Sequence, residues 1–563
     1  MKKNLLFVFL ITFLFSGHSQ STLITPGVTQ PSISATSTTN GVVIPRMTTI
    51  QKNSIVSVSA GTIVYDTNLS CLSLYTGNGW VCVNSPSSSL GPLFQNFQFI
   101  TNPSGNAPLT GVINVTSDQP IKLSYTVKGQ DGEDFTFSND KFSVDNDSTI
   151  NVYGLYPSFT NTVIVTITSQ TGYITQKTMY VTTDSVPIEL PQPSEIIVNS
   201  RSNNALTKFI LCFPYKMTGT FVPIGRGGFI TIIDTFGKIR WYLTLPFENN
   251  NIMIPLKNGN WLVPYKTNFK EIDLMGNIFK TTNLQFTYHH DVLQLPNNNL
   301  MYLGNSSLNN TIEDKIYTMD YLTGSIIDSL NLYTILDPTR PQLPQGPSND
   351  WFHANSLTYN STDNSILVSG RQQSAVVKID LSTKQLKWIL SDPTYWSPVL
   401  SPYLLTPTGL GFEQQWGQHS VVLKPNDSNT LILFDDGNDR SYTNPVLPIN
   451  NYSRLVEYTI NEASKTVSQN YQFGKEYGSL TYAPYVGKVE YLNNDRFFVG
   501  NGGIRKDANG NATGLGLSKN EIRFFEVDRG KQVYFDISIK TKYANNPQLV
   551  GFLSYRASCF NFK

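Results

Sequence analysis

The chain has 563 residues, a formal net charge of +1 and only 14% charged residues. Because binding to nucleic acid needs a basic surface, this balance argues against a nucleic acid as the partner. The length is sufficient for two or three domains, each with its own core. An aromatic content of 12%, together with abundant Asn, Thr, Ser and Gly, favours an exported all-β protein.

The first 19 residues have the pattern of a secretory signal peptide. Lys2 and Lys3 precede an apolar run from Leu5 to Phe15, and small and polar residues follow it. The run is too short to be a permanent anchor, and no later segment is long and apolar enough to span a bilayer. We therefore expect an exported protein without a membrane span, located in the periplasm or at the cell surface.

Residues 20–92 are predicted to form a small accessory segment, rich in Ser and Thr, that ends in a Ser/Pro linker. Cys71 and Cys82 flank a short turn, so we expect a disulfide between them in an oxidising compartment. Cys212 and Cys559 lie at the two ends of the ring argued below. A pairing between them is one of the connectivities that the sequence allows.

Residues 93–195 show apolar and polar residues in alternation, broken by turn residues. Examples are GVINVTS at 111–117 and IKLSYTVKG at 121–129. A period of two indicates strands that are buried on one face. The segment is therefore predicted to be a β-sandwich of immunoglobulin-like size.

Residues 196–563 contain a repeat that predicts a six-bladed β-propeller. Six copies of a strand–turn–strand unit are visible, among them ITIIDTFGKIRWYL at 230 and VVKIDLSTKQLKWI at 376. Between copies lies a hairpin with an Asn-rich turn, such as DVLQLPNNNLMYLG at 291. Four strands per unit make one blade. The last copy lacks the Asn-rich hairpin, and we expect the strand near Phe209 to close the ring.

All the histidines outside the predicted signal peptide fall inside this repeat. His290, His353 and His419 each lie seven residues before an asparagine of the turn that follows them. Equivalent positions in successive blades form a ring around the propeller axis, so the three imidazoles should point at one spot. Arg371 ends the returning strand of the His353 hairpin and should reach the same rim. Such a cluster is suited to an oxyanion.

Other residues near this register could have either a role in the site or a purely structural role. His289 is off the register, so we interpret it as a supporting neighbour. Asn355 follows His353 by two residues, and a period of two would put both side chains on one face. We predict that Asn355 binds substrate. Arg440 and Arg454 are as consistent with structural ion pairs as with support of the site.

These motifs resemble the arylsulfate sulfotransferase family. The matching segments are HHDVLQLPNNN at 289–299, DWFHANSLTYNSTDNSILVSGRQQSAVVKIDL at 350–381, GQHSVVLKPN at 417–426, LILFDDGNDR at 431–440 and YSRLVEY at 452–458. The resemblance runs from about residue 93 to the end. It implies a small β-sandwich followed by a six-bladed propeller, no nucleotide sulfate donor, and a histidine that becomes transiently sulfated.

By motif, the resemblance implies that His419 is the nucleophile and that His290, His353 and Arg371 bind the sulfuryl group, with Asn355 beside them. The expected reaction moves a sulfuryl group from a phenolic sulfate ester to a phenol acceptor through a sulfohistidine. His290 or His353 would exchange the proton with the phenol, and the sequence leaves open which. No metal, nucleotide or other cofactor is expected.

Two other interpretations and one assembly stay open. Three histidines around a propeller axis could hold a metal, although such sites commonly add a carboxylate and an arginine would repel a cation. A non-enzymatic surface or ligand-binding propeller is the second, because a fold does not fix a function. A homodimer is the assembly that the sequence leaves open.

Overall fold

The structure is a computed structural model that describes residues 43–83, 94–246, 252–305, 310–343, 347–514, 516–542 and 548–562. The chain divides into two compact units, residues 1–90 and residues 91–563. The predicted signal peptide lies outside the described residues. Within the described ranges, no helix has the length and hydrophobicity that crossing a bilayer takes.

The described part of the first unit is a four-stranded sheet with one short helix. The sheet has the order β1 (Arg46–Met47), β2 (Ile63–Asp66), β3 (Cys71–Tyr75) and β4 (Trp80–Cys82), and α1 spans Thr49–Asn53. The expected disulfide between Cys71 and Cys82 joins β3 to β4. A buried ion pair of 2.7 Å between Lys52 and Asp66 holds α1 against the sheet.

Two sheets follow in the second unit and pack face to face. One contains β5 (Phe94–Thr101), β6 (Gly111–Ser117) and β9 (Asp147–Val152); the other contains β7 (Ile121–Val127), β8 (Phe135–Ser138), β10 (Thr160–Ser169) and β11 (Ile174–Thr182). Every second residue of β6, β7 and β10 is buried, as the alternation predicts. The buried side chains of both sheets share one core, so this part of the chain is a β-sandwich.

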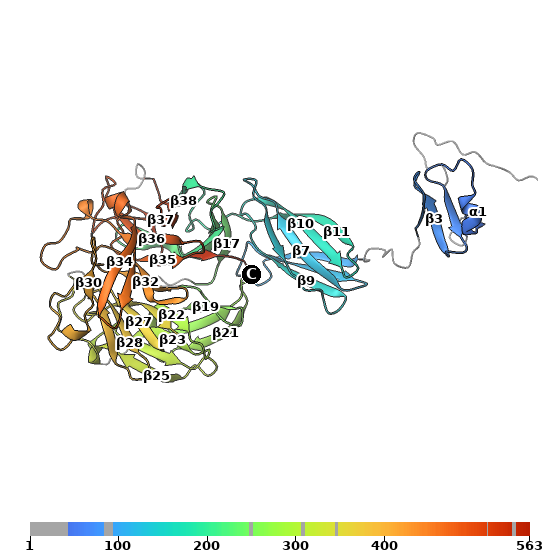
Figure 1. Ribbon diagram of the computed structural model, residues 1–563. Coiled ribbons are helices and arrows are strands. Elements are labelled where there is room, and N and C mark those ends of the chain that lie inside the picture. The colour runs from blue at the N-terminus through green and yellow to red at the C-terminus, as the bar shows by residue number, and fades with distance from the viewer. Residues whose placement is uncertain are drawn as a thin grey trace, which may run out of the picture. The chain divides into compact units, whose positions relative to one another are not determined.

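Six sheets of four or five strands and one sheet of three follow in the rest of the described residues, drawn from green to red in Figure 1. The first contains β40 (Ala557–Phe560), β13 (Phe209–Cys212), β16 (Ile230–Asp234) and β17 (Ile239–Leu243). The second contains β18 (Ile254–Pro255), β19 (Trp261–Pro264), β20 (Asn268–Ile272) and β21 (Ile278–Asn283). The third contains β22 (Thr287–Gln294), β23 (Leu300–Asn305), β24 (Lys315–Met319) and β25 (Ile326–Asn331).

The three histidines of the candidate site lie where the third, fourth and fifth of these sheets begin. The fourth contains β26 (Ala354–Asn360), β27 (Ser365–Gly370), β28 (Ala375–Asp380) and β29 (Leu386–Leu390). The fifth contains β31 (His419–Lys424), β32 (Asp427–Asp435), β33 (Arg454–Asn461), β34 (Thr466–Phe473) and the short β30 (Thr406–Thr408). The sixth contains β35 (Gly487–Tyr491), β36 (Arg496–Lys506), β37 (Lys519–Asp528), β38 (Val533–Ile539) and β12 (Ile196–Arg201). A small sheet of β14 (Tyr215–Met217), β15 (Pro223–Gly228) and β39 (Gly551–Leu553) lies beside them.

Each sheet from the second to the sixth begins with the hairpin that precedes a repeat copy and continues with that copy. The first sheet has no such hairpin, and the end of the chain completes it: β40 pairs with β13, with Cys212 opposite Ala557. The ring therefore closes near Phe209, as expected. The closing partner differs from the expected one, because the last copy, β37 and β38, pairs with β12 instead.

The expected pairing of Cys212 with Cys559 is wrong, and both thiols are free. The two residues do lie on neighbouring strands, β13 and β40. Cys212 is opposite Ala557, however, and Cys559 is opposite Ile210. The offset of two residues makes them diagonal neighbours, whose Cα atoms are too far apart for a disulfide.

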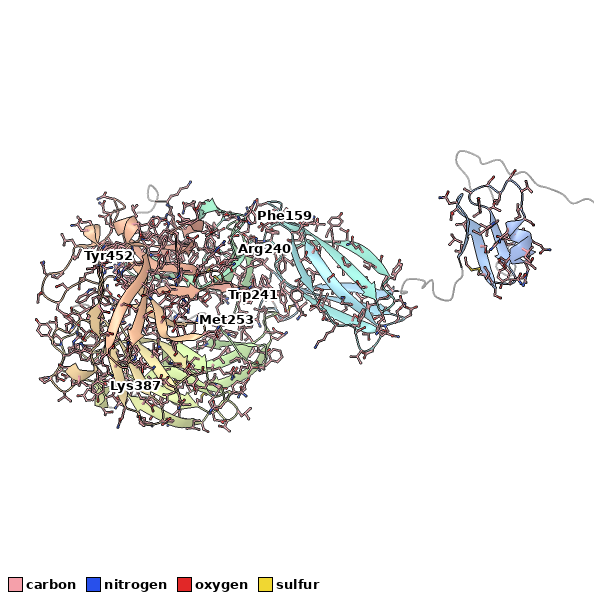
Figure 2. The ribbon with its side chains drawn as sticks, viewed as in Figure 1. Phe159, Arg240, Trp241, Met253, Lys387 and Tyr452 are labelled. Atoms are coloured by element: carbon pink, nitrogen blue, oxygen red, sulfur yellow. A yellow bond between two sulfur atoms is a disulfide. The ribbon has the colours of Figure 1, made fainter. Side chains whose placement is uncertain are left out.

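The sandwich and the first sheet are joined by buried contacts. Arg240 of β17, labelled in Figure 2, donates from Nε and Nη2 to the carbonyl of Gly154 at 2.9 and 2.6 Å. Its Nη1 forms a 2.8 Å ion pair with Asp234. The rings of Tyr153 and Phe562 stack with their centroids 5.5 Å apart. The sandwich thus holds the place where the ring closes.

Candidate active site

His290, His353 and His419 lie where three consecutive sheets begin: in β22, directly before β26, and at the start of β31. The ring centroids of His290 and His353 are 4.9 Å apart. The ring of Tyr555 stacks on His290 at 5.0 Å and meets the ring of His419 edge-on at 6.2 Å. Tyr555 therefore contacts two of the three imidazoles, and the third, that of His353, lies beside His290.

The backbone at these positions is unusual. His290 and His353 have positive φ angles of 59° and 53°, and Val486 of the sixth sheet has the same conformation at the same register. In the fifth sheet the positive φ belongs to Ser420, one residue after His419. A bulky residue with positive φ is rare and concentrates at functional sites. The backbone conformation at His419 therefore differs from that at the other two histidines.

Arg371 reaches the same group of residues. Its backbone N–H donates to the carbonyl of His353 at 3.0 Å, which fixes it beside that histidine. Its Nη2 donates to the carbonyl of Pro484 at 3.2 Å, and its buried Nε has no partner in the described ranges. A buried N–H that lacks an acceptor is costly unless a bound group supplies one. The guanidinium is thus available to an oxyanion.

Asp436 orients His419, a relation that the sequence analysis missed. The Nδ1 of His419 lies 2.8 Å from Oδ2 of Asp436, and both side chains are buried. Burial lowers the pKa of His419 well below its usual value, and the charge of Arg371 lowers it further. The ring is therefore neutral at neutral pH. Burial also raises the pKa of Asp436 well above its usual value. When Asp436 is ionised and Nδ1 donates to its carboxylate, the lone pair lies on Nε2.

Two further carboxylates, from Glu313 and Asp350, surround His353. Its Nδ1 lies 2.8 Å from Oε2 of Glu313 and 2.6 Å from Oδ2 of Asp350. Burial lowers the pKa of His353, but the two carboxylates outweigh it and raise the value to about 9. His290, 3.3 Å from Glu313, has its pKa lowered by burial despite that carboxylate. The two imidazoles thus differ in charge at neutral pH.

Asn355 does not occupy the position that a period of two predicts. β26 starts at Ala354, and its register shifts between Ala354 and Ser356, so Asn355 lies in a bulge. Its Nδ2 donates to the carbonyl of Gln418 at 2.8 Å, directly before His419. Its buried Oδ1 has no partner. Substrate binding by Asn355 stays a prediction.

Three family models match the chain. The model described as "Arylsulfotransferase (ASST)" matches residues 215–549, and the model described as "Arylsulfotransferase Ig-like domain" matches residues 98–184. The chain belongs to the arylsulfotransferase family. A third model, "Phage tail like trimerisation region", matches residues 25–96. It coincides with the accessory segment of this arylsulfotransferase.

Two curated relatives of this arylsulfotransferase are named "Arylsulfate sulfotransferase AssT". The protein from Escherichia coli O6:H1 is 26% identical over 524 residues, which cover 74% of this chain and 86% of the relative. That from Lelliottia amnigena is 26% identical over 516 residues, covering 72% and 83%. Among solved structures, a putative 6-phosphogluconolactonase from Bacteroides fragilis has a TM-score of 0.36 at 9% identity, covering 64% of this chain and all of that one.

The remaining residues of the candidate site fall into two groups. Arg440 and Arg454 form ion pairs with the buried Asp435 at 3.1 and 2.8 Å, so the structural interpretation holds for both. His289 contacts His290 edge-on at 5.1 Å, and burial lowers its pKa to about 3. His289 is therefore a neutral neighbour of the site.

The candidate site also contains two groups of atoms that could ligate a metal. These are His289, His290 and Glu313, and then Glu313, Asp350 and His353, whose ligating atoms lie within 4.8 Å of one another in each group. The carboxylate that a metal site commonly adds is therefore present. Glu313, which belongs to both groups, is a carboxylate that the spacing of the histidines does not predict.

Proposed function

We propose that this arylsulfotransferase moves a sulfuryl group from a phenolic sulfate ester to a phenol by a ping-pong mechanism, through a sulfohistidine at His419. One observation carries the proposal. His419 is buried, bonded to Asp436 through Nδ1, and close enough to Arg371 for that charge to lower its pKa. This is the environment of an activated nucleophile beside an anion-binding group. The family and its two relatives agree with the substrate class.

In the first half-reaction, the lone pair on Nε2 of His419 attacks the sulfur of the aryl sulfate. The bond from sulfur to the phenolic oxygen breaks, and the phenol leaves with that electron pair. Sulfuryl transfer, like phosphoryl transfer, places charge on the peripheral oxygens in a loose transition state. The unpartnered Nε–H of Arg371 is suited to bind one of these oxygens. The carboxylate of Asp436 stabilises the positive charge that develops on His419.

His353 supplies the proton for the leaving phenolate. With a pKa of about 9, its imidazole is protonated at neutral pH, whereas burial lowers the pKa of His290. His353 gives this proton to the departing oxygen and becomes neutral. In the second half-reaction it takes the proton of the acceptor phenol, whose oxygen attacks sulfur. The bond from sulfur to Nε2 breaks, and His419 is regenerated.

The direct test is the intact mass of the protein after incubation with donor alone. We expect the mass to rise by one sulfuryl group, and peptide mapping to locate that group on His419. The His419→Ala variant should gain nothing and should release no coloured phenol from 4-nitrophenyl sulfate. His289→Ala is the matched control, because this buried neighbour has no role in the proposed steps. Turnover that persists in His419→Ala would overturn the assignment.

A metal-dependent reaction is the second candidate, and Glu313 is the observation that favours it. The proposed steps themselves need no metal, nucleotide or other cofactor. Metal analysis of the purified protein separates the two candidates. A stoichiometric metal whose removal by chelator abolishes turnover would favour the metal site, and full turnover after chelation would favour the histidine mechanism.

The accessory segment supports a proposal about assembly. We propose that residues 20–92 bring three chains of an exported protein together, in place of the homodimer that the sequence left open. The trimerisation model matches this segment. Its described part exposes large apolar side chains, with Val43, Ile50 and Val56 each more than four-fifths exposed. Apolar surface on so small a unit favours contact with other copies.

A further inference from the structure

Arg505 of β36 is a buried arginine whose guanidinium is only partly bonded. Its Nε donates to the hydroxyl of Ser518 at 2.8 Å, and its Nη2 donates to the carbonyl of Gly516 at 2.5 Å. The side chain is completely buried, yet Nη1 has no partner among the residues that the structure describes. Leaving a buried, charged N–H without an acceptor costs free energy, so this group calls for a ligand.

Other buried arginines in the described residues have acceptors for their donors. Arg240 pairs with Asp234 and Arg454 with Asp435, and Arg340 donates to backbone carbonyls. Arg505 forms no ion pair with a carboxylate among the described residues. Only Arg371 and Arg505, of all arginines in the described part of the chain, keep a buried N–H without a partner. Arg505 thus shares the property that suits Arg371 to an external anion.

Tyr485 connects the two guanidiniums. Arg371 donates to the carbonyl of Pro484, the residue before it, at 3.2 Å. The Cζ of Arg505 lies 5.7 Å from the centroid of the Tyr485 ring. Burial raises the pKa of the Tyr485 hydroxyl, and the charges of Arg505 and Arg371 both oppose that rise. The two guanidiniums therefore lie beside two consecutive residues, Pro484 and Tyr485.

Phe221 adds an apolar wall to this region. Its ring centroid lies 6.3 Å from that of Tyr485 and 5.1 Å from the Cζ of Arg505. The side chain is 44% exposed, and its φ of 62° is a strained conformation for an aromatic residue. A hydrogen bond of 2.9 Å from its N–H to the carbonyl of Thr218 holds it there. Strain of this kind concentrates at binding and catalytic sites.

We propose that Arg505, Phe221 and Tyr485 form a second anion subsite, which binds a carboxylate on the ring of the phenol that reacts at His419. The inference rests on the proposed function and specifies its substrate as a phenol with an acidic substituent. A guanidinium with a free donor forms strong, charge-assisted hydrogen bonds with a carboxylate. The two aromatic rings beside it suit the aryl ring of the ligand. A neutral phenol would leave Nη1 without an acceptor.

The test compares two acceptors with one donor, 4-nitrophenyl sulfate. The kcat/KM for 4-hydroxyphenylacetate and for phenol is measured in the wild type, in Arg505→Gln and in Arg505→Lys. We expect the wild type to have a higher kcat/KM for 4-hydroxyphenylacetate than for phenol. In Arg505→Gln the ratio of these two values should fall by about tenfold or more. Arg505→Lys, which keeps the charge but not the planar fork, should lie between them.

Arg340→Gln is the matched control. This arginine is equally buried, but its donors are accepted by the carbonyls of Gln373, Asp392 and Thr394. The Arg340→Gln variant should lower the melting temperature as Arg505→Gln does. It should leave the ratio of kcat/KM for the two acceptors unchanged. The same ratio in the wild type and in Arg505→Gln would overturn the subsite.

A second measurement separates the subsite from the proposed function. If the wild type does not turn over 4-nitrophenyl sulfate, the proposed function fails, and calorimetric binding of the two acceptors then decides. Tighter binding of 4-hydroxyphenylacetate than of phenol, lost in Arg505→Gln, would support the subsite. Equal binding of both in the wild type would overturn it. If Arg505→Gln does not fold, the comparison is made with Arg505→Lys.

Discussion

Asp436 fixes the tautomer of His419 through the 2.8 Å contact with Nδ1. Asp436→Asn keeps the shape of the side chain, but its amide can hold the imidazole in the wrong tautomer. We expect kcat for 4-nitrophenyl sulfate to fall at least about a hundredfold, since the same change in a catalytic triad costs more. Asp363→Asn is the control, because Asp363 pairs with lysines and contacts no site residue. Equal losses in both variants would contradict this role.

Glu313 and Asp350 set the charge of His353, and this predicts the pH profile. Because the pKa of His353 is raised to about 9, the imidazolium that is proposed to protonate the leaving phenolate is present below that pH and is lost above it. The kcat/KM for an aryl sulfate with a poor leaving group should therefore fall as the pH rises through about 9. Glu313→Gln removes the largest raising influence, so this fall should move to lower pH. A profile that does not move would contradict the assignment of His353.

At the scale of the element, the ring is held by one terminal strand. β40 supplies the backbone partners of β13, and Phe560 is only 4% exposed. Phe560→Ala should lower the free energy of unfolding by about 3–5 kcal/mol, as for other buried aromatic truncations. Phe142→Ala, at a position that is 38% exposed, should have a much smaller effect. Denaturant unfolding followed by fluorescence measures both, and equal effects would mean that the closure contributes little.

The same closing segment completes the site. Tyr555, two residues before β40, stacks on His290 and contacts His419, and its hydroxyl donates to the carbonyl of Asn355 at 3.3 Å. Its neighbour Arg556 forms an ion pair of 2.7 Å with Asp291 of β22. Stability and catalysis are therefore linked, because one stretch of chain joins the ends of the ring and packs between two of the three imidazoles.

At the scale of the whole molecule, the proposed trimer can be tested separately from the reaction. Light scattering of the mature protein should give the mass of three chains, and deletion of residues 20–92 should give one chain. Turnover per chain should change little on deletion, because every proposed catalytic residue lies in the second unit. A full-length protein with the mass of one chain would exclude the assembly, and the mass of two would favour the homodimer instead.

The sequence alone determined the features that depend on local periodicity. Alternation predicted the strands of the sandwich, such as β6 and β10, and the repeat predicted a ring of similar sheets. The common register brought His290 and His353 together, because equivalent positions in consecutive sheets lie side by side. These features follow from residue spacing within a single strand or a single repeat.

Only the tertiary structure decided what depends on contacts between distant segments. Glu313, Asp436 and Tyr555 carry no periodic signal, and ring closure and loop geometry bring them to the histidines. The bulge at Asn355 and the register between Cys212 and Cys559 are likewise set by how neighbouring strands align. Pairing across strands depends on backbone irregularities that the spacing of residue types does not encode. For this physical reason the sequence located the histidine cluster, whereas only the tertiary structure shows the groups that orient the histidines and set their charge.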